Sequence, residues 1–599
     1  MFVRIFAVFF TAFLVVFPGF VREPLGLPVG AVDRLGLGLP ITLAASPDGR
    51  FLAVASTIGV EIWDPQGLTL RQLLAPHEAW VVGLSFSPTG EELAAALSNG
   101  YLFLWSTTDW RELERLRLPG QITDLAWASE EILYVGVDNA VYTVNLVDRL
   151  STKVLELPED ETIQSLALAP DGDLAVASDK RVRVFDMHVR KVRGELHLLG
   201  RRLLQYTKAG ELIVGGPNLR ILGGKTGEEI WAWQGEAQPI SLAPDETKLV
   251  FASDSSLFVL DLITKDLEVI GPAHETDIVG LAFCGPRLYS LDFEGTWKVW
   301  DLAKRTPEKS MEELRGPVFS LALSPSGETL AMGTLYSVHL GDLESKEIRR
   351  LRRKFDRVIH LAFVGEYLAV VDSQSLALVG METGALMRRK TGVRCLPEAW
   401  RFCAFSGDGA FFAFIDLESV LKELECCVIP VLRTQDLVHV TALRVERAQT
   451  LALDGQGNLL AIGKEKEIHV WALAEERIVR KLTGLDCTAR YLVFSPSGKF
   501  LASWAKCDGL RVWDLSSEEV LMRLPEEDIT CMTFAPDERK LAFGTSAGQV
   551  GLIDLSRPGQ PKRVFHRHTA GVYALVFSPD GSRLFSGSLD GTVLVWDVQ

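Results

Sequence analysis

Short apolar runs of about five residues, separated by turns rich in Gly, Pro, Asp, Asn and Ser, follow one another along almost the whole chain. The last unit is the clearest, with apolar runs at 572–577, 584–588 and 593–597 around the turns Ser578-Pro579-Asp580-Gly581 and Asp590-Gly591. Degenerate versions of the first turn recur at intervals of roughly forty residues, which gives fourteen copies of one unit. A fixed period of this length predicts stacked structural repeats.

Each unit is expected to be a small antiparallel sheet of four strands. The run 572–577 has no alternation of apolar and polar residues, which is typical of a strand buried on both faces. The fourth run of a unit, such as 346–351, carries charge and fits an outer, solvent-exposed edge. Only neighbouring copies can cover the two faces of such a sheet, and twisted sheets stacked in this way close into a ring of blades. A parallel β-helix is the alternative, but its repeats are shorter.

The units resemble those of the WD-repeat family. Trp-Asp closes the third strand at Trp63-Asp64, Trp300-Asp301, Trp513-Asp514 and Trp596-Asp597, and His77, His274 and His568 match the upstream histidine of that family. The resemblance implies a buried structural tetrad in the last blade, made of His568, Asp590, Trp596 and either Ser586 or Ser588. It also implies that Asn99 replaces the tetrad aspartate in the second blade and that Glu294 replaces it in the seventh.

The predicted fold class is all-β, with two tandem seven-bladed β-propellers built from fourteen four-stranded blades. At 599 residues the chain exceeds what one core normally fills. We therefore expect a first propeller at 41–315 and a second at 316–599, preceded by a signal or anchor segment at 1–22 and a linker at 23–40. The last unit ends on its third strand, so we expect a segment near 29–39 to supply the missing outer strand. The sequence leaves open which ring this strand closes.

The N-terminal segment determines the expected location of the protein. Residues 5–21 carry no charge and follow Arg4, which is typical of a signal peptide or a minimal membrane anchor. A membrane-anchored or exported protein is therefore predicted. If the segment is a wrongly assigned start or a buried strand, the protein is cytoplasmic.

The sequence offers little sign of catalysis. Gly544-Thr545-Ser546-Ala547-Gly548 matches a nucleophile elbow, but it sits in a hairpin where no helix follows. The eight cysteines include no C-x-x-C pair, so a zinc site is not expected, while a pairing of Cys487 with Cys507 or Cys531 stays open. We predict no enzyme activity, no cofactor, no bound metal and no small-molecule substrate, and a net charge of −16 opposes binding to nucleic acid.

The remaining candidates lie on the surface. Loops that enter the first strands are where the family usually binds protein partners, and the candidate partner-binding residues there are Trp80, Thr276, Asp277 and Tyr573. Outer strands of the second ring predict a basic rim, which is either a solvated edge or a surface for anionic lipid or an acidic partner; its residues are Arg349, Arg350, Arg352, Arg353 and Lys354.

Three functions stay open from sequence alone. The first is a non-catalytic scaffold for protein partners, held at a membrane or exported. The second is a propeller enzyme, or a protein that binds a small molecule or metal at the axle of a ring. The third is a cytoplasmic scaffold similar to the two-propeller actin-interacting proteins.

Overall fold

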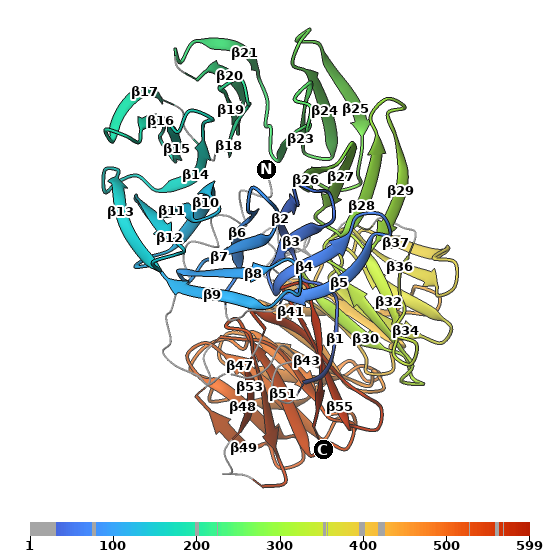
Figure 1. Cartoon of the computed structure of the whole chain (residues 1–599). Helices are drawn as coiled ribbons and strands as arrows, with labels where there is room; N and C mark the ends of the chain where they lie inside the picture. The colour runs from blue at the N-terminus through green and yellow to red at the C-terminus, as the bar shows by residue number, and fades with distance from the viewer. Residues whose placement is uncertain are drawn as a thin grey trace.

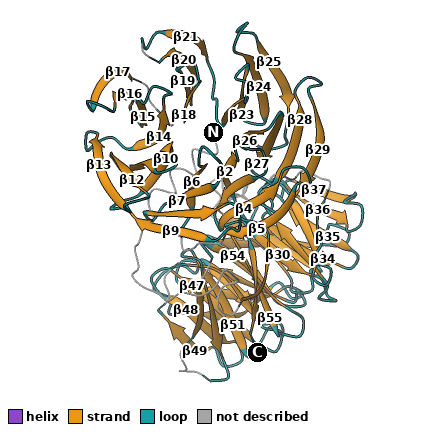
Figure 2. Ribbon diagram, viewed as in Figure 1, coloured by secondary structure: helices purple, strands orange, loops and turns teal. Residues whose placement is uncertain are grey.

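The computed structural model describes residues 31–74, 79–197, 200, 203–224, 226–351, 355, 357–393, 402–416, 426–525, 528–557, 562–566 and 568–598. These residues form strands and turns, and no α-helix is found among them (Figure 2). The strands make fourteen sheets of four strands each, arranged as two rings in tandem (Figure 1). The prediction of an all-β protein with two seven-bladed propellers is therefore confirmed. The predicted signal or anchor at 1–22 lies outside the described residues.

The first ring contains blades 1 to 7, and each blade takes four consecutive strands of the chain. In chain order these strands are β2 (Pro40–Ala45), β3 (Leu52–Ser56), β4 (Gly59–Asp64), β5 (Thr69–Leu74), β6 (Val81–Phe86), β7 (Glu92–Leu97), β8 (Tyr101–Ser106), β9 (Glu112–Arg117), β10 (Ile122–Ser129), β11 (Ile132–Val137), β12 (Ala140–Asn145), β13 (Leu150–Glu156), β14 (Ile163–Leu168), β15 (Leu174–Ser178), β16 (Arg181–Asp186), β17 (Lys191–His197), β18 (Leu203–Tyr206), β19 (Glu211–Gly215), β20 (Leu219–Gly223), β21 (Glu229–Trp233), β22 (Ile240–Leu242), β23 (Lys248–Ser253), β24 (Ser256–Asp261), β25 (Leu267–Pro272), β26 (Ile278–Cys284), β27 (Arg287–Asp292), β28 (Thr296–Asp301) and β29 (Thr306–Glu312).

The second ring contains blades 8 to 14, and its last blade takes one strand from the start of the chain. Its strands are β30 (Ser320–Leu323), β31 (Thr329–Gly333), β32 (Val338–Asp342), β33 (Ile348–Arg350), β34 (His360–Val364), β35 (Tyr367–Val371), β36 (Ser375–Gly380), β37 (Leu386–Thr391), β38 (Cys403–Phe405), β39 (Phe411–Phe414), β40 (Cys426–Arg433), β41 (Val438–Glu446), β42 (Thr450–Leu453), β43 (Leu459–Gly463), β44 (Ile468–Ala472), β45 (Arg477–Leu482), β46 (Tyr491–Phe494), β47 (Phe500–Ala505), β48 (Gly509–Asp514), β49 (Glu519–Leu524), β50 (Ile529–Phe534), β51 (Lys540–Thr545), β52 (Gln549–Asp554), β53 (Arg563–His566), β54 (Val572–Phe577), β55 (Arg583–Ser588), β56 (Val593–Asp597) and β1 (Ala31–Leu35).

Burial follows the position of a strand in its blade. The second strands β3 and β15 are buried at every residue, while the outer strands β13, β17 and β29 are mostly exposed. Apolar clusters lie between neighbouring blades, as where Ala53 and Ile62 of blade 1 pack with Leu93 and Phe103 of blade 2. Each blade therefore depends on its neighbours to bury both faces of its sheet, as the uninterrupted apolar runs indicate.

Both rings are closed by contacts between their first and last blades. In the first ring the inner strand β2 packs on the inner strand β26, and in the second ring β30 packs on β54. Leu43 of blade 1 joins Tyr289 and Trp297 of blade 7 in one apolar cluster. The contact of the first inner strand with the last closes each ring of blades.

The N-terminal strand β1 closes the second ring. It pairs antiparallel with β56, with Arg34 opposite Leu594 and Leu35 opposite Val593. Figure 1 shows β1, in blue, reaching from the first ring into the red end of the chain. The segment predicted to donate an outer strand therefore serves the second ring, and the chain crosses between the rings twice.

The two rings meet through the loops of blades 1, 7, 8 and 14. Thr57, in the β3–β4 hairpin, donates its hydroxyl hydrogen bond to the carbonyl of Asp590 in blade 14, at 2.5 Å. Glu294, in the β27–β28 hairpin, accepts hydrogen bonds from Thr334 at 2.9 Å and from Ser337 at 2.5 Å, both in blade 8. The rings are thus joined by hydrogen bonds from two blades of each ring.

A buried ion network lies at the same junction. Arg315, in the segment between β29 and β30, donates to both carboxylate oxygens of Glu61 on β4 and, at 3.3 Å, to Glu313. The side chains of Arg315 and Glu61 are 0% exposed. Burial raises the pKa of Glu313 to about 7, in opposition to the positive charge of Arg315, which lowers it. Burial likewise raises the pKa of Glu294.

The raised pKa of Glu313 predicts a pH dependence of stability. Because the folded-state pKa of about 7 exceeds the ordinary value of 4.5, the folded protein holds a proton that the unfolded chain releases between these values. The free energy of unfolding should therefore fall as the pH rises through this window. We expect Glu313→Gln to stabilise the protein at pH 8 by up to about 3 kcal/mol and to change little at pH 4.5.

Calorimetry between pH 4.5 and 8 tests this expectation. Glu308→Gln is the matched control, because Glu308 lies on the exposed strand β29 in the same segment of chain. A Glu313→Gln variant with the same stability as the wild type at every pH would contradict the prediction.

Candidate functional site

The two faces of each ring carry different loops. Loops that lead from an outer strand into the next inner strand lie on one face, together with the hairpins between second and third strands, because each sheet is an antiparallel meander. We call this the upper face. It contains His568, Asp590 and Trp80, and the junction between the rings lies on it.

The upper face of blade 14 brings together the four residues of the implied tetrad. His568 Nδ1 lies 2.8 Å from Asp590 Oδ2, and its Nε2 lies 2.8 Å from Ser586 Oγ. Trp596 Nε1 donates to the same hydroxyl at 2.8 Å. Since an indole N–H only donates, Ser586 can give its own proton to Nε2, which leaves Nδ1–H for Asp590. Ser588 instead donates to the carbonyl of Ala570, so Ser586 is the tetrad serine.

Blade 7 contains a second tetrad, but its acid is not the one expected. His274 lies 2.6 Å from Ser290 and 3.2 Å from Asp292, and Trp300 donates to Ser290 at 2.8 Å. The prediction that Glu294 replaces the tetrad aspartate is wrong. Asp292 stands two residues earlier, at the end of β27, and its shorter side chain reaches the histidine; Glu294 is thereby available to bind blade 8 across the junction.

Other blades bury ion pairs near the same place. In blade 4 the carboxylate of Glu161 accepts from both terminal nitrogens of Arg183, at 2.7 and 2.8 Å, and from Ser178 at 2.6 Å. The hydrogen bonds from Arg183 lower the pKa of Glu161 to about 2. In blade 1 Trp63 donates to Glu61 at 3.0 Å. The signal that could have found these pairs is a charged residue two positions before the tryptophan position of a third strand.

The Trp-Asp aspartates cap turns rather than contribute to the tetrads. Asp301 accepts backbone hydrogen bonds from Ala303 and Lys304 in the turn that leads to β29. Asp64 and Asp514 cap the equivalent turns of blades 1 and 12, and Trp513 donates to Ser503 at 2.9 Å. Asp597 is exposed at the end of β56.

The candidate partner-binding residues differ in their exposure. Trp80 is half-buried at the entry to β6, and Asp277 is half-buried at the entry to β26. Burial raises the pKa of Asp277, and the nearby carboxylates of Asp254 and Glu236 add to this shift. Tyr573 is half-buried on β54, with its ring 6.3 Å from that of Phe319. Thr276 is only 7% exposed, so it offers little surface to a partner.

The described residues of the predicted basic rim, Arg349 and Arg350, make different contacts. Arg352, Arg353 and Lys354 lie outside the described residues. Arg350 differs from the prediction, because its side chain is 8% exposed and forms an ion pair with Glu275 of the first ring, at 3.1 Å. It therefore contributes to the junction and not to a solvated edge. Arg349 donates to the carbonyls of Met381 and Glu382 in blade 9.

Arg349 belongs to a recurring contact between blades. The equivalent outer-strand arginines of blades 9 and 11 also reach the turn before the outer strand of the next blade. Arg388 of blade 9 donates to the carbonyl of Asp436, and Arg480 of blade 11 donates to the carbonyl of Leu515. The three arginines are equivalent because each lies opposite the same position of its third strand, namely Leu340 for Arg349, Leu378 for Arg388 and Val470 for Arg480. These arginines tie consecutive blades together along the outer edge of the ring.

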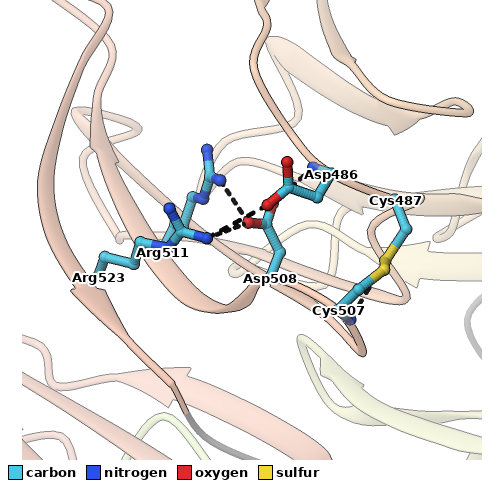
Figure 3. Close-up of a disulfide and its surroundings, with 6 residues drawn as sticks. All are labelled: Asp486, Cys487, Cys507, Asp508, Arg511 and Arg523. Atoms are coloured by element: carbon cyan, nitrogen blue, oxygen red, sulfur yellow. Dashed lines mark hydrogen bonds and ion pairs between the residues drawn. A yellow bond between two sulfur atoms is a disulfide. The ribbon is translucent and has the colours of Figure 1, made fainter.

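A disulfide lies on the upper face of blade 12. Cys487, in the loop before β46, is bonded to Cys507 in the β47–β48 hairpin, with a Cα–Cα distance of 6.1 Å (Figure 3). Of the two pairings left open by the sequence, this is the one formed. Cys531 is a free, buried thiol.

The described residues contain no group of three or more His, Cys, Asp or Glu side chains that could hold a metal ion. Nor do they contain a helix with the length and apolar character needed to cross a membrane.

Comparison with known proteins finds WD repeats in three stretches of the chain. The family model for the WD domain, G-beta repeat, matches residues 68–106, 151–186 and 559–597. The 66 kDa stress protein of Physarum polycephalum is 22% identical over 94% of this chain and 97% of its own length. Actin-interacting protein 1 of Drosophila melanogaster is 19% identical over 95% of this chain and 90% of its own length.

Other similarities are local. Protein groucho of Drosophila melanogaster is 29% identical over 22% of this chain, and the chain spans only 19% of that protein's length.

Proposed function

Because this chain is a WD-repeat protein built from two tandem seven-bladed propellers, we propose that it is a scaffold that binds protein partners on the upper faces of its rings. The observation that carries this proposal is the junction. Blades 1, 7, 8 and 14 hold the two rings together through buried hydrogen bonds and the Glu61–Arg315 pair. Such a connection favours a rigid body that presents its loops in a constant arrangement, which is how a scaffold positions binding residues.

Trp80 is the residue to test first. It is half-buried at the entry to an inner strand, and an aromatic side chain in such a position is a frequent hot spot of protein interfaces. Trp110 of the same blade is also half-buried but lies in the turn between β8 and β9, on the opposite face, with its ring 5.0 Å from that of Phe51.

The experiment is quantitative affinity purification of the full-length protein. We expect a stoichiometric protein partner, whose recovery falls roughly tenfold or more with Trp80→Ala and is unchanged with Trp110→Ala. If the wild type captures no partner at near-equal amounts, the scaffold proposal fails. If both variants capture the partner equally, the partner does not depend on this part of the upper face.

We propose further that the scaffold is held at a membrane or exported through residues 1–22. The uncharged run 5–21 supports this proposal, and so does the Cys487–Cys507 disulfide, because disulfides persist in oxidising compartments. Cell fractionation with protease protection tests it. A protein recovered entirely from the cytoplasm would rule out the anchor and leave the scaffold in place.

A second candidate concerns the partner. Co-linear similarity over 95% of the chain to a protein named actin-interacting protein 1 favours an actin-type filament as an alternative partner. Co-sedimentation with actin filaments at physiological salt tests this directly. A protein that remains in the supernatant at all filament concentrations would eliminate the candidate.

A further inference from the structure

We propose that the Cys487–Cys507 disulfide is a site of thiol–disulfide exchange that fixes or releases a loop on the upper face of blade 12. The class of reactant is a small thiol such as glutathione. This inference does not depend on which protein partner the scaffold binds.

The disulfide joins the same two segments that a histidine joins elsewhere. In blades 7 and 14 a histidine before the inner strand contacts an aspartate in or beside the hairpin between second and third strands. In blade 12 the loop before β46 has no histidine, and Cys487 occupies that loop while Cys507 occupies the hairpin. A covalent bond therefore replaces the His–Asp hydrogen bond at the equivalent place.

The hairpin has its own support, independent of the disulfide. Asp508 follows Cys507, and its carboxylate accepts from Arg511 on β48 and, at 2.7 Å, from Arg523 on β49 (Figure 3). Both arginines come from strands of the blade itself. Opening of the disulfide should therefore leave the hairpin in position.

The loop before β46 is held at its ends. Leu485 and Ala489 are buried in the apolar cluster between blades 11 and 12, and the carbonyl of Gly484 accepts from Arg511 at 2.8 Å. Between them the supports near Cys487 are the disulfide, the hydrogen bond from the Asp486 amide to Asp508 at 3.1 Å, and an exposed ion pair between Asp486 and Arg523 at 3.4 Å. Reduction should thus release the short segment 486–488 and leave the ring closed.

The bond is accessible to a reactant. Cys507 is exposed and Cys487 is half-buried, whereas Cys284, Cys403, Cys427 and Cys531 are all buried. Burial raises the pKa of Cys284 to about 11 and that of Cys531 to about 12, which keeps these thiols unreactive. Thiol chemistry of the described side chains is therefore concentrated at the blade 12 pair.

Reduction of the bond proceeds by two successive thiol–disulfide exchanges. A thiolate attacks the sulfur of Cys507, the S–S bond breaks, and Cys487 leaves as a thiolate that takes up a proton. A second thiol then attacks the mixed disulfide and frees Cys507. In total two small thiols give two electrons and two protons to the protein and leave as their own disulfide.

The experiment is hydrogen exchange of the full-length protein in glutathione buffers of graded redox ratio, with thiol alkylation and mass spectrometry to measure the fraction bonded. On reduction we expect amides of 486–488 to exchange at least about tenfold faster. The histidine-closed loop 568–571 serves as the internal reference and should not change. The variant Cys487→Ser/Cys507→Ser should exchange fast in every buffer.

Three results would overturn the proposal. They are a pair that alkylation finds unbonded even in oxidising buffer, equal exchange of 486–488 in both states, and faster exchange throughout the second ring on reduction. The last would make the disulfide a support of the whole ring. Should the double variant fail to fold, the redox titration of the wild type still decides the matter.

Discussion

Replacement of Arg315 by leucine is expected to lower the free energy of unfolding by about 3–5 kcal/mol. The side chains of Arg315 and Glu61 are fully buried, and two hydrogen bonds join them across the segment that links the rings. Without the guanidinium, the carboxylate of Glu61 stays buried and loses its ion pair with Arg315. An unpaired buried charge is far more costly than the loss of an exposed pair.

Two further variants separate this cause from a general effect of lost charge. Arg305→Leu removes an exposed pair with Glu268 and should cost less than about 1 kcal/mol. Arg315→Leu/Glu61→Gln removes the stranded charge but keeps an acceptor for the indole of Trp63, so it should recover most of the loss. Calorimetry is the measurement. An Arg315→Leu variant no less stable than Arg305→Leu would contradict the prediction.

The fold was accessible from the sequence because each unit repeats the same physical requirement. A strand such as 572–577 is apolar on both faces, so only a neighbouring sheet can cover it, and the turn Ser578–Gly581 marks each recurrence. The outer strands can be predicted equally well, since runs rich in charge, such as 346–351, mark the edge of the blade that meets water. None of these signals depends on contacts between distant parts of the chain.

The junction could not be predicted in the same way. Glu294 aligns with the tetrad aspartate of blade 14, yet it bonds to Thr334 and Ser337 of blade 8. Arg350 occupies an outer strand, where exposure is the normal expectation, and is buried because the first ring covers it. Both residues follow the repeat pattern and depart from it only where the second ring meets the first. A contact between two domains leaves no trace in the periodicity of either one.

The closing strand is the second place where a large effect is expected. Leu35 of β1 is 5% exposed and packs with Leu314, Val593 and Met332. Val32, on the same strand, is 48% exposed. We expect Leu35→Asp to destabilise the second ring by about 3 kcal/mol or more, because it places an unpaired carboxylate in an apolar cluster. Val32→Asp should stay within about 0.5 kcal/mol of the wild type.

Hydrogen exchange locates the damage and so tests ring closure itself. β1 is the partner of β56 on its outer side, so detachment of β1 leaves the amides of β56 unprotected on that edge. Leu35→Asp should therefore speed exchange in 593–597 first and leave the inner strands of the first ring unchanged. If Leu35→Asp and Val32→Asp behave alike, β1 does not close the ring in solution. Faster exchange in the first ring as well would mean that the two propellers do not unfold independently, since the junction then transmits the loss of one closing strand to both.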